Sequence, residues 1–189
     1  KKTDFKQDQV LLTGEGFGGS SLYGEADFAN IKLYGDVIEA SGLGNFMYTE
    51  LEKAMAGKIA GASLSMGQTR QVVSGSSTPK DVETMLQLTY LYFTNIKKDQ
   101  ESFDNLMKTY ELQLKNKAAS PDAASSDSLS LTLSSHNPRF APLSMDDLKK
   151  VSYDRILEIA KEQTANAAAW TFTIISNYDE AAIRPPIEQ

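Results

Sequence analysis

The sequence predicts an α+β domain with a largely antiparallel sheet and helices packed on one face of it. Three observations lead to this fold class. Apolar residues recur with a period of two in a few short segments and with the helical period in several longer ones. Neighbouring predicted strands are joined as hairpins. The regular alternation of strand and helix that indicates a parallel sheet does not occur, and neither does an internal repeat.

The first predicted elements are a strand and a helix. A short buried strand is expected over 10–13, and it ends in the glycine-rich stretch 14–19. A helix is expected over about 25–41 and stops at Gly42, because glycine accepts the left-handed conformation of a helix C-terminus. Its inward positions are Phe28, Ile31, Val37 and Ile38.

A short helix and a hairpin are predicted next. The helix covers about 49–56 and ends at Gly57. Residues 60–66 alternate between apolar and small polar or glycine positions, which is typical of a half-buried strand. Residues 70–74 supply its hairpin partner.

The strongest helical pattern begins at Pro79. Thr78 is expected to cap this helix, Pro79 to occupy its first position, and Asp81 to favour the positive end of its dipole. Apolar residues continue as far as Ile96 on so much of the circumference that the helix is expected to be buried on more than one side. Asp99 opens a second helix, and the short connection predicts an antiparallel pair.

The C-terminal part mixes weak and strong signals. Residues 118–135 are rich in serine, alanine and aspartate, and we interpret them as a mobile connection or a weakly held helix. Ser144 and Ser152 are predicted helix caps, the second of which opens an amphipathic helix. Residues 170–174 alternate aromatic or aliphatic side chains with threonine and predict a strand with one packed face.

Composition and charge limit the classes of function. With 189 residues, 41% hydrophobic and 23% charged, the chain suits one globular domain, residues 1–189, which we expect to be part of a longer polypeptide. The net charge of −6 argues against a nucleic-acid or anionic-membrane surface. No apolar run approaches the ~20 residues that cross a bilayer, and no targeting segment is present in these residues. The absence of cysteine leaves the cellular compartment open.

Metal-binding residues are scarce. The sequence has one histidine, His136, and no cysteine, whereas a catalytic zinc needs about three protein ligands, usually with histidine among them. No loop gathers the oxygen ligands of a calcium site. We therefore expect no metal and no cofactor to be held by this chain.

The glycine-rich stretch matches a dinucleotide fingerprint, with Gly14, Gly16 and Gly19 following a predicted strand. Glu39 even stands where a ribose-binding acid would lie. However, Glu15 puts a negative charge where phosphate would bind, and the next helix starts several residues too late. Nucleotide binding is therefore the weakest of three hypotheses, and an irregular strand edge or bulge is the competing explanation of these glycines.

Other catalytic patterns are no stronger. The stretch 61–65 approaches G-x-S-x-G but ends in serine, and His136 is the sole imidazole that could serve as a base. The carboxylate pairs Asp146–Asp147 and Glu50–Glu52 are explained as helix-start and surface charges. The segment 75–80 suits an anion at a helix N-terminus or simple capping equally well. We therefore predict no catalytic residue.

A series of motifs carries a family resemblance. The motifs are 18–23 (GGSSLY), 40–46 (ASGLGNF) with 50–51 (EL), 56–58 (AGK), 75–81 (GSSTPKD) and 86–94 (LQLTYLYFT). In this order and spacing they resemble the first domain of the C-terminal half, the third of four related domains, of bacterial zinc proteases in the insulinase/pitrilysin family. The similarity spans roughly residues 3–185.

The resemblance implies a fold and the absence of catalytic residues. The implied fold is the insulinase/mitochondrial processing peptidase-like one, in which two halves enclose a chamber. Only the first domain of that family carries the inverted zinc motif H-x-x-E-H and a further glutamate ligand. The corresponding stretch here, 31–41, has no histidine, and Glu39 alone echoes the motif's glutamate. No catalytic, cofactor-binding or metal-binding residue therefore carries over, and zinc is expected in the catalytic half of the parent chain.

The resemblance also implies a role and partners. The leading hypothesis is a non-catalytic domain that walls the chamber of a zinc endopeptidase and contacts its peptide substrate. Its partners would be the catalytic N-terminal half, the following domain and the peptide, without nucleic acid or a membrane span. The alternative is a stand-alone binding or assembly module. Relatives suggest the bacterial periplasm, although a cytoplasmic location stays open, and the family's first strand is missing before residue 1, which would leave a sheet edge bare.

Overall fold

The computed structural model describes residues 8–177 and 184–185. The strands are β1 (Val10–Phe17), β2 (Gly42–Leu43), β3 (Ala60–Met66), β4 (Arg70–Ser77), β5 (Ile96–Lys97) and β6 (Trp170–Ser176). The α-helices are α1 (Phe28–Lys32), α2 (Tyr34–Glu39), α3 (Tyr48–Ala54), α4 (Val82–Thr94), α5 (Gln100–Ala118), α6 (Pro121–Leu133), α7 (Met145–Leu148) and α8 (Tyr153–Thr164). Short 3₁₀ turns are η1 (Gly19–Leu22), η2 (Glu25–Asp27), η3 (Pro79–Asp81), η4 (Pro138–Phe140) and η5 (Ala167–Ala169).

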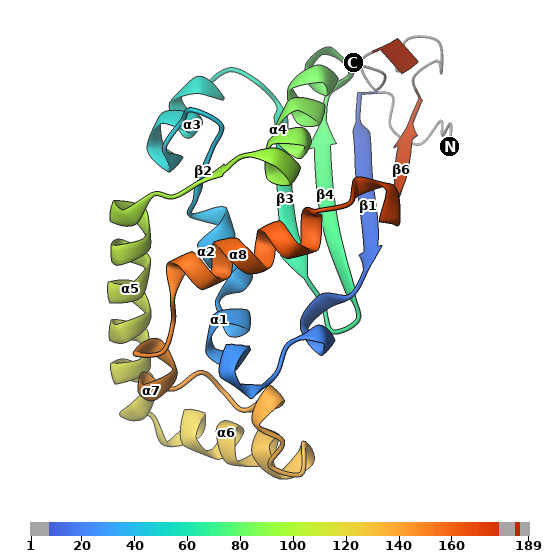
Figure 1. Ribbon diagram of the computed structural model, residues 1–189. Coiled ribbons are helices and arrows are strands. Elements are labelled where there is room, and N and C mark those ends of the chain that lie inside the picture. Colours follow the sequence, from blue (N-terminus) through green and yellow to red (C-terminus); the bar gives the residue numbers. More distant parts are fainter. Residues whose placement is uncertain (1–7, 178–183, 186–189) are drawn as a thin grey trace.

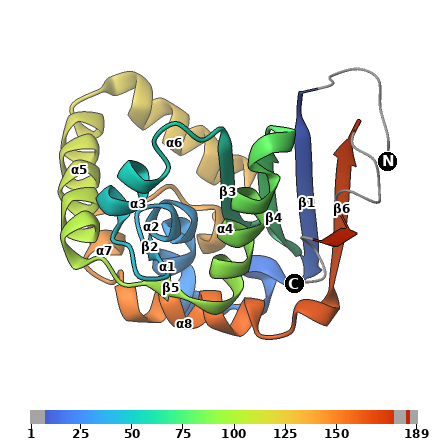
Figure 2. The same ribbon diagram turned by 90° about the horizontal axis from the view of Figure 1, so that it is seen from above.

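The main sheet is antiparallel throughout and has the strand order β3-β4-β1-β6. Helices α2, α4 and α8 lie on one side of it, and the other side carries no described helix (Figures 1 and 2). The burial of β4 alternates residue by residue, as a sheet with one covered face requires. The predicted α+β fold with helices on one face of an antiparallel sheet is confirmed.

The core lies between the sheet and the covering helices. The buried residues of α4 recur three or four positions apart on one face, and its other apolar residues are only partly buried, so the predicted burial on more than one side is not confirmed. Helix α8 crosses beneath it, and the edge of the Phe93 ring meets the Trp170 ring with centroids 4.9 Å apart. The buried apolar side chains of the larger core cluster are Tyr23, Leu33, Tyr34, Val37, Ile38, Leu43, Leu64, Val73, Leu88, Tyr92, Tyr153, Ile156, Ile159, Ala160 and Trp170.

The predicted helix over 25–41 is interrupted. It consists of the turn η2 and the helices α1 and α2, which meet at Leu33, where φ is −108° and ψ is 4°. This break lets the consecutive residues Leu33 and Tyr34 both enter the core, each only 1% exposed. An unbroken helix would have directed neighbouring side chains about 100° apart.

Gly42 does not form the left-handed helix end that the sequence predicted. It pairs with Lys97 in the two-stranded sheet of β2 and β5. A side chain on Gly42 would place Cβ 2.2 Å from the carbonyl oxygen of Phe46, so the glycine is required by a close approach of two backbones. The left-handed position is Gly44, with φ of +61°.

Helices α4 and α5 are not an antiparallel pair, so that prediction is wrong. The connection between them pairs with β2 as β5, and α5 then starts beside α3 and runs away from α4 (Figures 1 and 2). Helix α5 contacts α6 and α7 instead. A short connection favours an antiparallel helix pair only when the connection itself pairs with no other element. Here it forms β5 and pairs with β2.

Helix caps were predicted with mixed success. The side chains of Asp99, Ser144 and Ser152 accept backbone N–H groups at the starts of α5, α7 and α8, at 3.1, 3.1 and 3.3 Å. Thr78 precedes the turn η3 but makes no side-chain cap, because its hydroxyl donates to the Asp81 carboxylate at 3.0 Å. Pro79 occupies the first position of that turn, as predicted.

The serine-rich segment 118–135 is largely helical. Helix α6 begins with Pro121 at its first position, and the Ser120 hydroxyl accepts the Ala123 N–H at 3.4 Å. It contacts α5, to which the ion pair of Lys117 and Asp127, 2.7 Å apart, also joins it. Of the two interpretations from sequence, the helix is therefore the one confirmed.

Strands β1, β4 and β6 are longer than predicted, β3 has the predicted bounds, and the hairpin of β3 and β4 is confirmed. Strand β4 continues to Ser77, and β1 runs through the glycine-rich stretch to Phe17. Within the described residues, β3 and β6 form the sheet edges. The prediction of a missing first strand concerns residues at or before 1–7, which lie outside the described residues. No helix among the described residues is long and apolar enough to cross a membrane.

Candidate functional site

The glycine fingerprint does not form a phosphate-binding loop. Gly14 and Gly16 lie inside β1, which pairs on both sides with β4 and β6 in an unbroken register. Gly19 lies in the turn η1 with φ of +71°. The nucleotide hypothesis is therefore wrong, because a phosphate cradle needs free backbone N–H groups in a loop before a helix. The alternative of a bulge is also wrong, since the register has no extra residue.

The strand glycines instead make room for large neighbours. A Cβ on Gly14 would lie 2.6 Å from Val73 Cγ1 and 2.7 Å from the Phe172 ring, and one on Gly16 would lie 2.8 Å from the Trp170 ring. All three distances are shorter than atoms in contact allow. The glycines thus serve the packing of the sheet.

The remaining sequence candidates have structural partners. His136 is exposed at the end of α6, where φ is 56° and its N–H donates to the Leu131 carbonyl at 2.8 Å. The Asp147 carboxylate binds Lys32 at 2.9 Å, and the Glu50 carboxylate accepts the Met47 N–H at 2.8 Å. The stretch 61–65 lies in β3, and 75–77 lies in β4. None of these positions joins another candidate to form a site.

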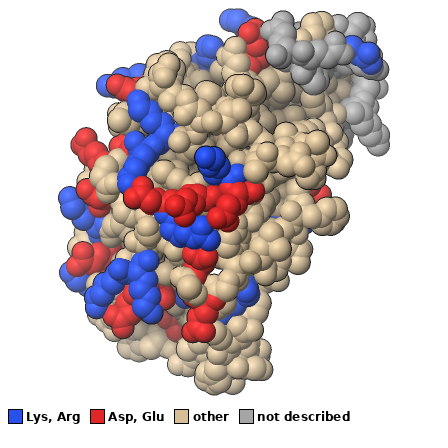
Figure 3. Space-filling model, viewed as in Figure 1, with Lys and Arg blue, Asp and Glu red and all other residues tan. Residues whose placement is uncertain are grey.

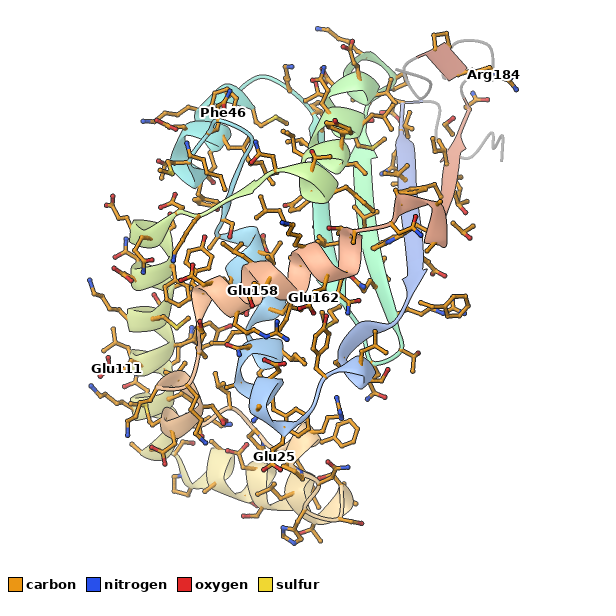
Figure 4. All side chains as sticks on the ribbon, in the orientation of Figure 1. Glu25, Phe46, Glu111, Glu158, Glu162 and Arg184 are labelled. Atoms are coloured by element: carbon orange, nitrogen blue, oxygen red, sulfur yellow. The ribbon has the colours of Figure 1, made fainter. Side chains whose placement is uncertain are left out.

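The most visible charge grouping is an acidic band along α8 (Figure 3). Its members include Asp154, Glu158 and Glu162, the last two of which are labelled in Figure 4. Asp154 pairs with Lys98, while the Arg155 guanidinium binds both glutamates, at 3.2 and 2.8 Å. Each of these three carboxylates is therefore ion-paired within the domain, and Arg155 is shared with Asp27 as well.

A cleft of about 530 Å³ lies between α2, the start of α3 and α5. We call it the α2–α5 cleft. Most of its lining residues carry carboxylate, amide, phenol or hydroxyl groups, and Ala40 and Leu106 are the aliphatic ones. The lining residues are Asp36, Glu39, Ala40, Tyr48, Thr49, Ser102, Asn105, Leu106, Thr109, Tyr110 and Gln113.

Asp99 fixes the walls of this cleft relative to one another. Its carboxylate caps α5 through Ser102 N–H and accepts the Tyr48 N–H at 3.0 Å, so the starts of α5 and α3 share one anchor. The Asp99 N–H donates to the Tyr153 phenol oxygen at 2.9 Å. Hydrogen bonds to the backbone N–H groups hold the pKa of the Asp99 carboxyl below its usual value although burial opposes this, so the anchor is charged at neutral pH.

The acids of the cleft come from one face of α2. Asp36 accepts a hydrogen bond from the Tyr110 phenol, whereas Glu39 has no hydrogen bond or ion pair with any residue that the structure describes. Burial, together with Asp36, raises the pKa of Tyr110 to about 12. Burial and the nearby carboxylates of Glu52 and Glu39 also raise the pKa of Tyr48. Both phenols therefore stay protonated at neutral pH, and each donates its proton within the domain, Tyr48 to Glu52 at 3.3 Å and Tyr110 to Asp36.

The cleft does not fit zinc. It lies at the stretch where the family resemblance places the zinc motif, but its acids are Asp36 and Glu39, and Ala40 brings no ligand. Within residues 8–177 and 184–185, no three histidine, cysteine, aspartate or glutamate side chains come close enough to hold a metal ion. A zinc site needs at least three protein ligands, so no zinc chemistry is assigned to these residues.

Most of the cleft was not predicted from sequence. Glu39 was singled out, but Asp36, Tyr48 and Tyr110 were not. Asp36 and Glu39 are three residues apart on one helix and so share a face, which a helical plot reveals. The tyrosines come from α3 and α5, and no local pattern predicts that these helices meet α2.

Comparisons with known proteins agree with this fold. No protein-family model matches the chain. A curated zinc protease of Arabidopsis thaliana, described as PQQL-like, is 24% identical over 190 residues, which cover 100% of this chain and 17% of that protein. The structure of the periplasmic protease PqqL from Escherichia coli matches 98% of this chain and 20% of its own length, with a TM-score of 0.80 and 16% identity.

A third match concerns an inactive domain. The peptidase M16 inactive domain from Pseudomonas fluorescens matches 96% of this chain and 44% of its own length, with a TM-score of 0.71 and 14% identity. The chain thus corresponds to one part of much longer proteins. The chain is thus similar over its full length to a zinc protease, and it shares its fold with the PqqL protease and with the peptidase M16 inactive domain.

Proposed function

We propose that this chain is a non-catalytic domain of a zinc endopeptidase, where it walls the chamber and contacts the peptide substrate. One observation carries the proposal. At the stretch where the family places its zinc motif, the chain folds into the polar α2–α5 cleft, which has two carboxylates and no imidazole. A cleft with this lining can bind a peptide through hydrogen bonds but cannot activate a zinc-bound water.

The greater length of the related proteins supports the proposal. The chain covers 17% of the curated zinc protease and 44% of the solved inactive domain, so related sequences occur as parts of multi-domain proteins. Zinc and the glutamate that acts as base would belong to another domain of the parent. The periplasm, where the Escherichia coli relative resides, is the proposed compartment.

The test is to sequence the gene upstream of the codon for Lys1 and to express what it encodes. We expect an H-x-x-E-H motif with a downstream glutamate in a related domain. That catalytic half, mixed with this chain, should form a stable complex in analytical ultracentrifugation and cleave unstructured peptides faster than it does alone.

Two outcomes would contradict the proposal. If the upstream sequence holds no such motif, the chain is a stand-alone binding or assembly module with the same fold. If the motif is present but the two parts neither associate nor affect cleavage, the domain does not wall the chamber.

A further inference from the structure

The α2–α5 cleft has an unbalanced charge. Asp36 and Glu39 are the charged residues of its lining, and no lysine or arginine is among the residues that line it. In the acidic band on α8, by contrast, each of the three carboxylates forms an ion pair, with Lys98 or with Arg155. A cleft with two carboxylates and no basic group favours a cationic ligand.

The two carboxylates are available to a ligand. Tyr110 donates to one oxygen of Asp36, and a carboxylate can accept further hydrogen bonds. Glu39 is exposed and makes no hydrogen bond or ion pair within the described part of the chain. Burial and, after it, the Glu39 carboxylate raise the pKa of Tyr92 to about 12.

The rest of the lining suits an extended basic side chain better than a metal ion. A metal would need at least three ligand side chains, and the described residues do not group them. A guanidinium group can donate to a carboxylate and to the amide oxygens of Asn105 and Gln113 at once. The rings of Tyr48 and Tyr110 offer faces on which a cation is stabilised, and Leu106 offers apolar surface to an aliphatic stem.

We propose that the α2–α5 cleft binds a basic side chain, arginine or lysine, of a peptide. The inference rests on the proposed function, because it names the substrate class of the surface that contacts the peptide. In the intact protease, such a cleft would favour peptides with a basic residue at a fixed distance from the cleaved bond.

The test is an NMR titration of the ¹⁵N-labelled chain with two peptides. Both have blocked termini and a serine- and alanine-rich sequence, but one has a central arginine and the other citrulline, which has a similar size and no charge. We expect the arginine peptide to shift the amide signals of Glu39, Thr49 and Asn105. The citrulline peptide should bind roughly five-fold more weakly, as expected for the loss of one partly exposed ion pair.

Two matched variants test whether Glu39 causes the preference for the arginine peptide. Glu39→Gln should remove most of the discrimination between the two peptides. Glu111→Gln makes the same change of net charge on α5, but Glu111 pairs with Lys115 and does not line the cleft (Figure 4). This control should keep the full discrimination. Both positions are on the surface, so both variants are expected to fold.

The outcomes separate this inference from the proposed function. Equal binding of both peptides in the cleft would overturn the preference for a basic residue and leave substrate contact standing. The absence of any shift in the cleft would overturn both proposals. An equal loss of discrimination in Glu39→Gln and Glu111→Gln would show that net charge, and not the cleft, attracts the peptide.

Discussion

The phenol oxygen of Tyr153 lies 2.8 Å from the hydroxyl oxygen of Ser41, in the buried layer between α2 and α8. Because Ser41 donates its own proton to the Val37 carbonyl at 2.7 Å, Tyr153 is the donor between the two. The same phenol oxygen accepts the Asp99 N–H at 2.9 Å. One side chain of α8 therefore joins the end of α2 to the start of α5 and sets the distance between the walls of the α2–α5 cleft.

Replacing Tyr153 by phenylalanine should destabilise the domain by about 1–3 kcal/mol. The ring would remain stacked on Phe103, with centroids 4.6 Å apart, so the packing is retained. The Asp99 N–H, however, would lose its acceptor in a buried place, and that loss is costly. The free energy of unfolding, measured with urea, checks this. An unchanged free energy would mean that the phenol oxygen is not what holds the start of α5.

The glycines of β1 lead to a second prediction. Gly16→Ala should destabilise the domain by about 1–3 kcal/mol, because the new Cβ would lie 2.8 Å from the Trp170 ring and force β1 and β6 apart. Trp170 is the sole tryptophan of the sequence, so its fluorescence reports the disturbance directly. Urea unfolding followed by this fluorescence measures both the change in the free energy of unfolding and the disturbance around the tryptophan ring.

Gly61→Ala is the matched control. Gly61 lies in β3, and nothing comes within 4 Å of the position that its Cβ would occupy. Its φ is not in the left-handed region, so alanine there should be neutral or slightly stabilising. Equal effects of the two substitutions would show that both strands need glycine for its backbone, and that contact with Trp170 is not the reason.

Local signals explain what the sequence predicted correctly. The caps at Asp99, Ser144 and Ser152 depend on residues within one turn of the helix start, and all three are present. The hairpin of β3 and β4 likewise depends on alternation and a short turn. Such features are determined by neighbours in the chain, so one sequence is enough to find them.

Long-range packing explains the errors. Gly14 and Gly16 match a loop motif in the sequence, yet they lie in strand β1. The rings of Phe172 and Trp170, which are far away in the sequence, occupy the space that a side chain at these positions would need. The connection after α4 was expected to fold back, but its pairing with β2 turns α5 toward α3. The α2–α5 cleft is a consequence of that pairing. Its tyrosines therefore could not be assigned to one site before the path of the chain was known.

Asp27 provides a prediction about pH. The Arg155 guanidinium donates to both oxygens of the Asp27 carboxylate, each at 3.0 Å, and this holds the pKa of Asp27 below its usual value. A carboxyl group whose pKa is lowered by folding stabilises the protein above its unfolded pKa of about 4. That contribution is lost as the pH falls through the lower pKa of the folded state.

Asp27→Asn should therefore reduce the free energy of unfolding at pH 7 by about 1 kcal/mol, near the upper end for partly exposed ion pairs. The difference from the unsubstituted protein should shrink as the pH is lowered below about 4, because the carboxyl is then neutral in both. Urea titrations between pH 7 and 3 measure this. Asp146→Asn, which removes an exposed pair with Lys149, should change little at any pH. A difference for Asp27→Asn that does not vary with pH would contradict the role of charge.

Tyr34, like Tyr153, is a tyrosine buried in the core. Its side chain is 1% exposed, burial raises its pKa, and its hydroxyl has no hydrogen-bond partner among the described residues. A buried hydroxyl without a partner costs free energy, so Tyr34→Phe should leave the stability unchanged or raise it by about 1 kcal/mol. The chemical change is the same as in Tyr153→Phe, but the expected sign is opposite. Parallel urea unfolding of the two variants tests this directly, and a loss of 1 kcal/mol or more in Tyr34→Phe would show that its hydroxyl is hydrogen-bonded in solution.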